Sequence, residues 1–299
     1  MVKRTRFILY GALIVFACLF MVGTFLDEQI NAALFHDKNT FGLIVSVIGT
    51  TPGYGVFSIL GGGLLALGLR KDYKTWMRVL LLVGCAVCLG VSTYFAGREF
   101  FGPNGFYWIA SRFWGYFIAF PAMCGLTYLG YVVFKGNDYK YLWIVILILI
   151  AAFAIALTAG VSLFKVIFHR PRFRAVMGSA LDYYPWYERC GNYKELMEIN
   201  GLAEEEFKSF PSGHAASSIG FPLFALFLPL FSKKYAKWSL PVFGCGLAFA
   251  LLVMFSRLFV GAHYLSDVSM GSMITLVFFI VAFEVIFNNK KLNVSLSDE

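Results

Sequence analysis

Long apolar runs separated by short polar segments make up most of the chain. Eight of these runs are close to the length that a helix needs to cross ~30 Å of hydrocarbon. They cover residues 7–26, 53–69, 77–97, 113–134, 142–164, 214–231, 239–256 and 268–287. A shorter run at 41–48 is cut from the second span by a Gly- and Pro-containing segment, and we expect it to be an interfacial or re-entrant piece. The pattern predicts an all-α fold, a polytopic membrane helical bundle with about eight transmembrane helices.

The composition agrees with a membrane protein. Hydrophobic residues make up 59% of the chain and charged residues 14%, and the mean hydropathy is +0.73. These values exclude an ordinary soluble domain. Basic residues ahead of the first apolar run resemble the start of a signal peptide, but the run is long enough to span, so we predict a retained first helix. We expect one membrane-embedded domain over residues 1–299.

The chain has a net charge of +8, and its basic residues lie in short loops between the apolar runs. No basic arm with interleaved aromatics stands apart from the spans, so we predict no nucleic-acid partner. Under an eight-span count one side carries five basic groups, Lys3/Arg4/Arg6, Arg70/Lys71/Lys74/Arg78, Lys135/Lys140, Lys233/Lys234/Lys237 and Lys290/Lys291. The positive-inside rule then places both termini in the cytoplasm. On the other side, apart from Lys38, Arg98, Arg112 and a few basic residues in an acidic loop, the basic residues belong to three polar clusters, which favours a ligand there.

These three clusters carry the candidate chemistry. They are Lys165 with Arg170 and Arg172, then Pro211-Ser212-Gly213-His214, then Ser256-Arg257 followed by His263 and Asp267. The guanidinium and ammonium donors suit the oxygens of a phosphate group. Ser212 and Gly213 directly precede an apolar helix that begins near His214, so a hydroxyl and backbone N–H groups meet at a helix N-terminus, a ready anion site. The clusters predict a phosphate-binding site.

Two histidines suit the breaking of a phosphoester bond. His263 and Asp267 are spaced i, i+4, so on a helix they share a face, and the carboxylate can hold one ring nitrogen while the other points at phosphorus. His214, on a separate helix, is free to protonate the departing alkoxide and then to activate water. The sequence offers no carboxylate cluster suited to Mg²⁺ and no Cys/His spacing suited to Zn²⁺. We therefore predict a metal-independent reaction without a cofactor, in which basic residues stabilise the transition state.

The clusters resemble the three-part signature of the type 2 phosphatidate phosphatase, or lipid phosphate phosphatase, superfamily. In that family the motifs are Lys-x6-Arg-Pro, Pro-Ser-Gly-His and Ser-Arg-x5-His-x3-Asp, and the second and third are complete here. The first is imperfect, because Lys165 and Arg172 have the right separation but Phe173 replaces the expected proline. An Arg170-Pro171 pair lies two residues earlier, which makes Arg170 an additional candidate for the phosphate site.

The resemblance implies the roles of individual residues. His263 is the nucleophile, Asp267 its partner and His214 the general acid. The implied phosphate binders are Lys165, Arg172, Ser212, Gly213 and Arg257. The resemblance also implies a six-helix phosphatase-like core within the bundle, three motifs carried by a catalytic core at residues 142–287, and a site at the extracytoplasmic face. Residues 1–141 then form N-terminal spans that include an extra helix pair.

The segment 175–210 is the one sizeable loop of the prediction. It holds the aromatic residues Tyr183, Tyr184, Trp186 and Tyr187, a helix-like stretch at 193–199 and the acidic run Glu204-Glu205-Glu206. A lid that shapes access to the site is one interpretation, but we favour an interfacial aromatic belt with a solvated acidic face. Arg174, just before the loop, suits lipid headgroups, solvent or the substrate phosphate.

The predicted function is hydrolysis of a phosphomonoester or pyrophosphate on a membrane lipid, through a phosphohistidine intermediate, by a multi-pass enzyme of the cell membrane. A phosphotransferase that moves the phosphate to a lipid or sugar acceptor would use the same residues and stays open. A transporter is disfavoured, because the predicted spans carry almost no ionisable residues apart from Glu284. The motifs do not identify the lipid, and a small soluble phosphoester is also open.

Overall fold

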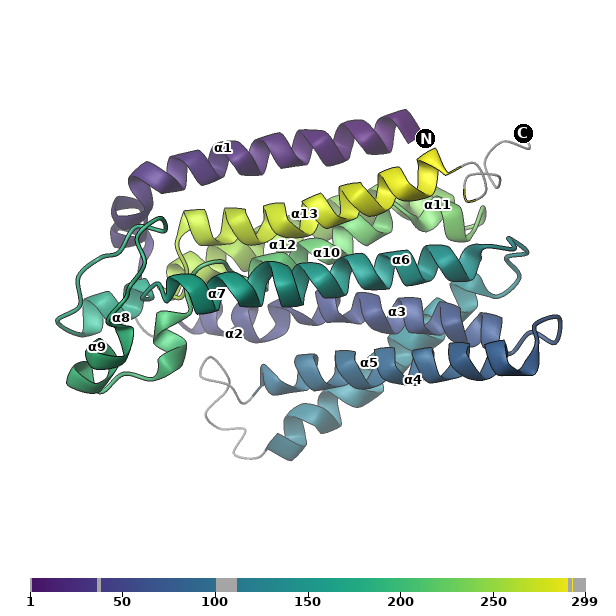
Figure 1. Cartoon of the computed structure of the whole chain (residues 1–299), viewed down its shortest axis with the longest axis horizontal. Coiled ribbons are helices and arrows are strands. Elements are labelled where there is room, and N and C mark those ends of the chain that lie inside the picture. The colour runs from purple at the N-terminus through teal and green to yellow at the C-terminus, as the bar shows by residue number, and fades with distance from the viewer. Residues whose placement is uncertain (1, 37–38, 101–111, 290–291, 293–299) are drawn as a thin grey trace.

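The computed structural model describes residues 2–36, 39–100, 112–289 and 292, so the predicted basic pair Lys290/Lys291 lies outside the described residues. The described residues form helices and no strand. In chain order the elements are α1 (Val2–Leu34), α2 (Thr40–Gly49), α3 (Thr51–Gly68), α4 (Thr75–Arg98), α5 (Arg112–Phe134), α6 (Leu142–Ile155), the π-helical η1 (Ala156–Ser162), α7 (Leu163–Phe168), α8 (Phe173–Gly178), α9 (Tyr193–Asn200), η2 (Glu204–Phe207), α10 (Gly213–Ala225), α11 (Leu228–Phe231), η3 (Ala236–Trp238), α12 (Ser239–Phe259) and α13 (Leu265–Asn288). The prediction of an all-α helical bundle is confirmed (Figure 1).

Seven helices of the described chain are long and apolar enough to cross a membrane. The protein is therefore an integral membrane protein, but the predicted count of eight spans is not confirmed. The predicted span 214–231 is divided into α10 and α11, neither of which is long enough alone. At the break, the N–H groups of Leu226 and Phe227 bond to carbonyls three residues back. Pro222 lies just before this break and lacks the N–H that a continuous helix would use.

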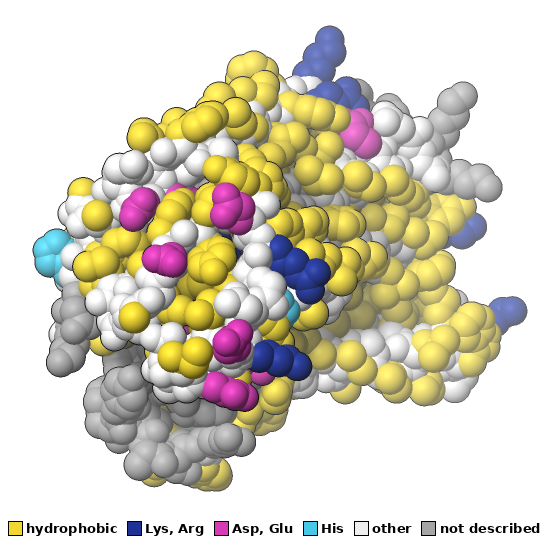
Figure 2. Space-filling model, turned by 60° about the vertical axis from the view of Figure 1, so that its left-hand side comes forward, with side chains coloured by type: hydrophobic (Ala, Val, Ile, Leu, Met, Phe, Trp, Pro, Cys, Tyr) yellow, Lys and Arg dark blue, Asp and Glu magenta, His cyan; other side chains and the backbone are white. Residues whose placement is uncertain are grey.

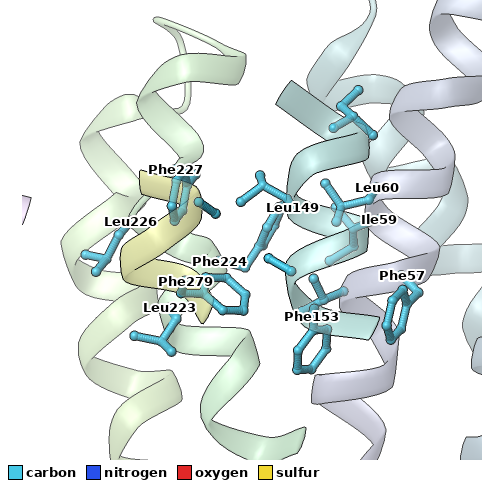
Figure 3. Packing of buried hydrophobic residues seen from close by; sticks show 14 of the residues in the cluster. Phe57, Ile59, Leu60, Leu149, Phe153, Leu223, Phe224, Leu226, Phe227 and Phe279 are labelled. Carbon is cyan, nitrogen blue, oxygen red and sulfur yellow. The ribbon is translucent and has the colours of Figure 1, made fainter. Parts of the chain in front are cut away.

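The helix α10 nevertheless occupies the centre of the bundle. It packs against α3, α12 and α13, and most of its residues are buried. A series of ring contacts, Phe227 to Phe279 to Phe153 to Phe57, links the α10–α11 turn through α13 and α6 to α3 (Figure 3). Such edge-to-face and offset pairs add to the burial energy of large aromatic side chains. This core fixes α10, and with it the second polar motif at its N-terminus.

The short run at 41–48 differs from the prediction. It belongs to α2, which is separated from α3 only by Thr50, a residue with helical backbone angles. The two helices lie end to end (Figure 1) and make one 29-residue candidate span, Thr40–Gly68. The expected interfacial or re-entrant piece is thus the first part of a candidate span, and the carbonyl of Ser46 in α2 lies 3.2 Å from the His214 Nε2 of α10.

Glycines of α3 allow α4 and α5 to approach closely. A Cβ on Gly62 would lie 2.0 Å from the Thr127 carbonyl oxygen of α5, and a Cβ on Gly61 would lie 2.9 Å from the Cys88 Cβ of α4. Small residues at such crossings let helix backbones pack tightly in a membrane. The pair α4–α5 is therefore firmly attached to α3, which places the C-terminal end of α4 near the candidate site.

The first helix is longer than predicted and runs along α13. At one end, Arg6 donates to both carboxylate oxygens of Glu284, at 2.8 and 2.7 Å. At the other end, Asp27 accepts a hydrogen bond of 2.9 Å from the Ser266 N–H, and Asn31 donates to the His263 carbonyl at 3.0 Å. These polar contacts extend α1 eight residues beyond its predicted end at 26 and bring its last turns to the third motif.

The bundle has two chemically different ends. The start of α1, the end of α13 and the loops that join α3 to α4 and α5 to α6 lie at one end (Figure 1). The three motifs, α8 and α9 lie at the other end. The predicted grouping of basic loops opposite the motifs therefore agrees with the arrangement of the helices.

Candidate active site

The second and third motifs meet where three helix ends converge. His214 is in the first turn of α10, and His263 lies in the turn between α12 and α13. Their ring centroids are 6.5 Å apart and the ring planes are tilted by 50°. Two imidazoles that are 49 positions apart in the chain, 263 minus 214, thus face each other across a gap that a phosphoryl group can occupy.

His263 is held differently from the prediction. It precedes α13, so it does not share a helical face with Asp267. Its Nδ1 lies 2.7 Å from the Ser209 carbonyl oxygen, whereas the nearer Asp267 oxygen is 3.6 Å away, beyond hydrogen-bond range. Because a carbonyl only accepts, Nδ1 carries the proton and Nε2 keeps its lone pair. Burial, the largest cause, lowers the pKa of His263 to about 3 although Asp267 opposes the shift, so the ring is neutral.

Asp267 acts on the backbone around His263. Its Oδ2 accepts the Tyr264 N–H at 2.9 Å, which caps α13, and the Ser209 hydroxyl at 2.5 Å. Ser209 in turn presents its carbonyl to His263. The carboxylate therefore fixes both the turn that carries His263 and the residue that orients its ring.

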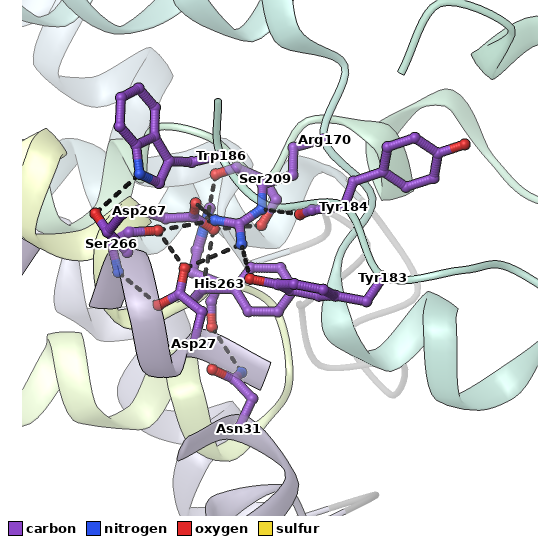
Figure 4. A network of polar contacts seen from close by, with 12 residues as sticks. Asp27, Asn31, Arg170, Tyr183, Tyr184, Trp186, Ser209, His263, Ser266 and Asp267 are labelled. Atoms are coloured by element: carbon purple, nitrogen blue, oxygen red, sulfur yellow. Dashed lines mark hydrogen bonds and ion pairs between the residues drawn. The ribbon is translucent and has the colours of Figure 1, made fainter. Parts of the chain in front are cut away.

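Arg170 is fully buried in this network (Figure 4). Its guanidinium donates to Asp267 at 2.6 Å and to Asp27 at 3.0 Å. It also donates to the Tyr184 carbonyl, the Tyr183 hydroxyl and the Ser266 hydroxyl, and it stacks 3.8 Å from the Tyr264 ring centroid. All of its nitrogens have protein partners, so the geometry favours a role in holding Asp267 over contact with a phosphate.

Arg172 and Arg257 have the opposite character. Both are buried, and among the described residues the Nε and Nη1 of Arg172 and all three guanidinium nitrogens of Arg257 have no hydrogen-bond partner. The remaining Arg172 nitrogen lies 3.8 Å from Glu205. Lys165 is half-buried and makes no hydrogen bond or ion pair within the described part of the chain. Buried cations without partners are strongly unfavourable, so this arrangement indicates that an anion binds there.

The N-terminus of α10 completes the cradle. The Ser212 hydroxyl accepts the Ala215 N–H at 3.3 Å, and the Ser212 N–H donates to the Asp267 carbonyl at 2.9 Å. Ser212 is thus the N-cap, and the amides of Gly213 and His214 are among those that a helix leaves without internal partners. A Cβ on Gly213 would meet only Val161, at 3.8 Å. Protein packing does not require this glycine, so the free space beside it is available to a ligand.

A cavity of about 630 Å³ opens from these groups. Its polar end is lined by Lys165, Arg172, Gly213, His214 and His263, together with Arg98, Glu99, Glu205 and Lys208. Its other walls are largely apolar and come from α3, α4, α6, η1 and α7. Charged side chains lie on this end and at the far end of the molecule, whereas the part of the bundle between them is covered mainly by hydrophobic side chains (Figure 2).

Two groups of the N-terminal spans also reach the site. The Nε2 of His214 lies 3.2 Å from the Ser46 carbonyl of α2 and 3.6 Å from the Glu99 carboxylate, which follows α4. Neither group belongs to one of the three motifs. Asp27 was also missed, although a carboxylate at the end of an apolar run is a signal for a buried partner.

The acidic run of the loop is a solvated face only in part, because Glu204 and Glu205 are 58% and 46% exposed while Glu206 is turned into the protein. The Arg172 N–H donates to the Glu206 carbonyl at 2.8 Å. The Glu206 carboxylate, only 15% exposed, pairs with Arg174 through two hydrogen bonds. Lys208 pairs with Glu204 and Glu205. The loop therefore packs onto the first motif, and Arg174 is engaged by the protein.

Some aromatic residues of the loop also pack against the rest of the protein. Trp186 donates to the Thr24 hydroxyl of α1 at 3.0 Å and stacks on Phe210. Tyr183 contacts Arg170, whereas Tyr187 is exposed. The loop is thus a packed cap that ties α1 to the first motif, and an interfacial belt accounts for few of its aromatic side chains.

The comparisons with known proteins give one match. The model of the PAP2 superfamily matches residues 141–291, which include all three motifs. No curated protein and no solved structure matches the chain. The match supports phosphatase-type activity on phosphate esters. With a match over half of its length, the chain belongs to the PAP2 superfamily.

Proposed function

We propose that the protein hydrolyses a phosphomonoester or diphosphate on a membrane lipid through a phosphohistidine on His263. The observation that carries this proposal is the pair of imidazoles, with ring centroids 6.5 Å apart, beside buried guanidinium nitrogens of Arg172 and Arg257 that have no hydrogen-bond partner among the described residues. A phosphate placed there would receive hydrogen bonds from the guanidinium groups on one side. On two other sides it would face a ring nitrogen of His263 and a ring nitrogen of His214. This matches the needs of an in-line phosphoryl transfer.

The reaction has two steps. The Nε2 lone pair of His263 attacks phosphorus, the bond between phosphorus and the ester oxygen breaks, and the departing oxygen takes a proton from His214. Then His214, now neutral, takes a proton from water, the resulting oxygen attacks phosphorus, and the P–N bond breaks to release phosphate and restore His263. Lys165, Arg172, Arg257 and the first amides of α10 stabilise the charge on the remaining oxygens.

The walls of the cavity support a lipid substrate. Several lining residues are both apolar and exposed, among them Val87 and Val91 of α4 and Val166 of α7. Since these helices are candidate spans, the cavity opens sideways toward the hydrocarbon region. An acyl or prenyl tail can then lie against α4 and α6 while its phosphate reaches the histidines.

A homologous series of alkyl phosphates tests this function. With purified protein in detergent, we expect released inorganic phosphate to show kcat/KM rising about two- to fourfold for each added methylene until the groove is filled, because each buried CH₂ contributes about 0.8 kcal/mol. Equal rates along the series would contradict a lipid substrate and favour a small soluble phosphoester.

The same assay with a glycerol or lipid alcohol acceptor detects phosphotransfer, and EDTA tests the predicted metal independence.

We place the site at the extracytoplasmic face. The basic loops gather at the end of the bundle opposite the motifs, and such loops favour the cytoplasmic side. Reporter fusions to the N-terminus and to the loop between α3 and α4 are expected to signal the cytoplasm. A periplasmic or external signal from both would reverse the assigned orientation.

Arg257→Met is expected to lose phosphate binding without losing stability. In the absence of an anion, Arg257 is a buried charge with no partner among the described residues, and a hydrophobic side chain of similar size is often neutral or stabilising at such a position. Inorganic phosphate at a hundred times its Kd should stabilise the wild type by about 2.7 kcal/mol. Thermal unfolding in detergent with and without phosphate measures both effects. Equal stabilisation of the variant by phosphate would show that Arg257 does not bind it.

A further inference from the structure

The surroundings of His214 disfavour the charge that its proposed task requires. A general acid must carry a proton when the substrate arrives. The ring lies at the positive end of the α10 dipole, and Lys165, Arg172 and Arg257 carry positive charge on the same side of the cavity. The second imidazole, His263, also faces it. All of these groups favour a neutral His214.

One carboxylate opposes them. The Glu99 Oε2 lies 3.6 Å from the His214 Nε2, and among the described residues no other carboxylate forms an ion pair with this ring. The remaining acidic groups of the site are engaged elsewhere. Asp267 pairs with Arg170, and Glu205 pairs with Lys208. Arg98, adjacent to Glu99 and exposed, stacks on Phe95.

We propose that Glu99 is a positioning residue that keeps His214 protonated for its role as general acid. This inference rests on the proposed function. The Ser46 carbonyl accepts from Nε2 at 3.2 Å and orients the ring, while the Glu99 carboxylate, 3.6 Å from Nε2, stabilises the imidazolium by charge attraction. When the ester bond breaks, the proton passes from His214 to the departing oxygen and Glu99 is unchanged. The proton that His214 then takes from water restores the ion pair.

The burial of Glu99 strengthens this coupling. Its side chain is 16% exposed, and burial is the largest cause that raises the pKa of this carboxyl. Burial also strengthens the attraction between a Glu99 carboxylate and a His214 imidazolium, because little water screens the two charges, and this attraction favours the proton on His214. Around His263 a carboxylate, Asp267, also fixes the position of a histidine. The two histidines differ in protonation, because His263 is neutral and His214 carries a proton in this proposal.

Glu99 comes from the N-terminal spans. It follows α4, whose backbone is fixed against α3 at Gly61, and it lies outside the residues 141–291 that match the family. The extra helices therefore contribute to the chemistry of the site as well as to the wall of the cavity.

The pH profile of kcat/KM provides the first test. Since the acid works only when protonated, activity falls as the pH rises past the point where His214 loses its proton. Glu99→Gln removes the negative charge at nearly constant shape, so we expect this alkaline limb to move to lower pH, and the rate on an alkyl phosphate at neutral pH to fall about 10- to 100-fold. Glu99→Asp keeps a carboxylate and should retain more activity. Glu198→Gln, on the exposed side of α9, is the matched control and should behave as the wild type.

Substrate reactivity provides the second test. An aryl phosphate releases a phenolate that needs no proton, so kcat/KM for this substrate should be nearly unchanged in Glu99→Gln, whereas a structural defect would lower both rates alike. Equal losses on both substrates, or no loss on either, would overturn the role of Glu99. A wild-type protein that cleaves neither substrate would instead refute the proposed function, and the inference with it.

Discussion

Replacing His263 with alanine is expected to reduce phosphate release by about 10⁴-fold or more, because loss of a covalent nucleophile removes the whole two-step path. The neutral ring presents Nε2 toward the second imidazole and is locked by the Ser209 carbonyl at 2.7 Å. No other described histidine lies within the same cavity except His214, whose Nε2 faces Ser46 and Glu99. Phosphate release from an alkyl phosphate by purified protein measures the loss.

The control for this variant is another histidine at the same end of the bundle. His36 follows α1, is stacked on Phe259 and lies outside the cavity. His36→Ala should retain wild-type activity. If His263→Ala kept a substantial rate with a wild-type unfolding temperature, the assigned nucleophile would be wrong.

Arg170→Met is expected to destabilise the protein by about 3–5 kcal/mol, the usual effect of removing one partner from a buried ionic cluster. Arg170 is the buried cation between Asp27 and Asp267, and all three side chains are fully buried. Without it two carboxylates remain close together in a low-dielectric region. Unfolding in detergent, followed by heat or denaturant, measures the change.

Two further variants separate this effect from phosphate binding. Arg174→Met breaks the pair with Glu206, whose side chains are 22% and 15% exposed, and should cost less than Arg170→Met, because one carboxylate instead of two loses its partner. Adding Asp27→Asn to Arg170→Met removes one uncompensated charge and should restore part of the stability. A stable Arg170→Met protein with a raised KM would instead make Arg170 a substrate ligand, as the first motif's alternative frame allows.

The sequence predicted best those features that depend on residues close together in the chain, namely the apolar helices and the three polar motifs. Apolar runs located the long helices, because a membrane span must be apolar over most of its length. The three motifs located the residues that converge at one end of the bundle, including both imidazoles and the unpaired Arg172 and Arg257. The family match over 141–291 confirms the resemblance that these motifs indicated.

The sequence was least informative where contacts join distant segments. Asp27 follows the first apolar run by a single position, yet its partners Arg170 and Ser266 lie more than a hundred residues away. The spacing of His263 and Asp267 suggested a shared helical face, but α13 begins after His263 and the carboxylate became a helix cap. The division of the run 214–231 has Pro222 as its one local signal, and the approach of Glu99 to His214 has none, since it depends on how the spans pack.

The central claim is tested most directly by trapping the covalent intermediate. In His214→Ala, an aryl phosphate can still phosphorylate the enzyme because its phenolate leaves unaided, but water is no longer activated to break the P–N bond. Rapid quenching and peptide mapping should then find an acid-labile, base-stable phosphate that accumulates on His263, and none in His263→Ala. Turnover by the wild type with no such label in His214→Ala, or a label on a different residue, would contradict the account.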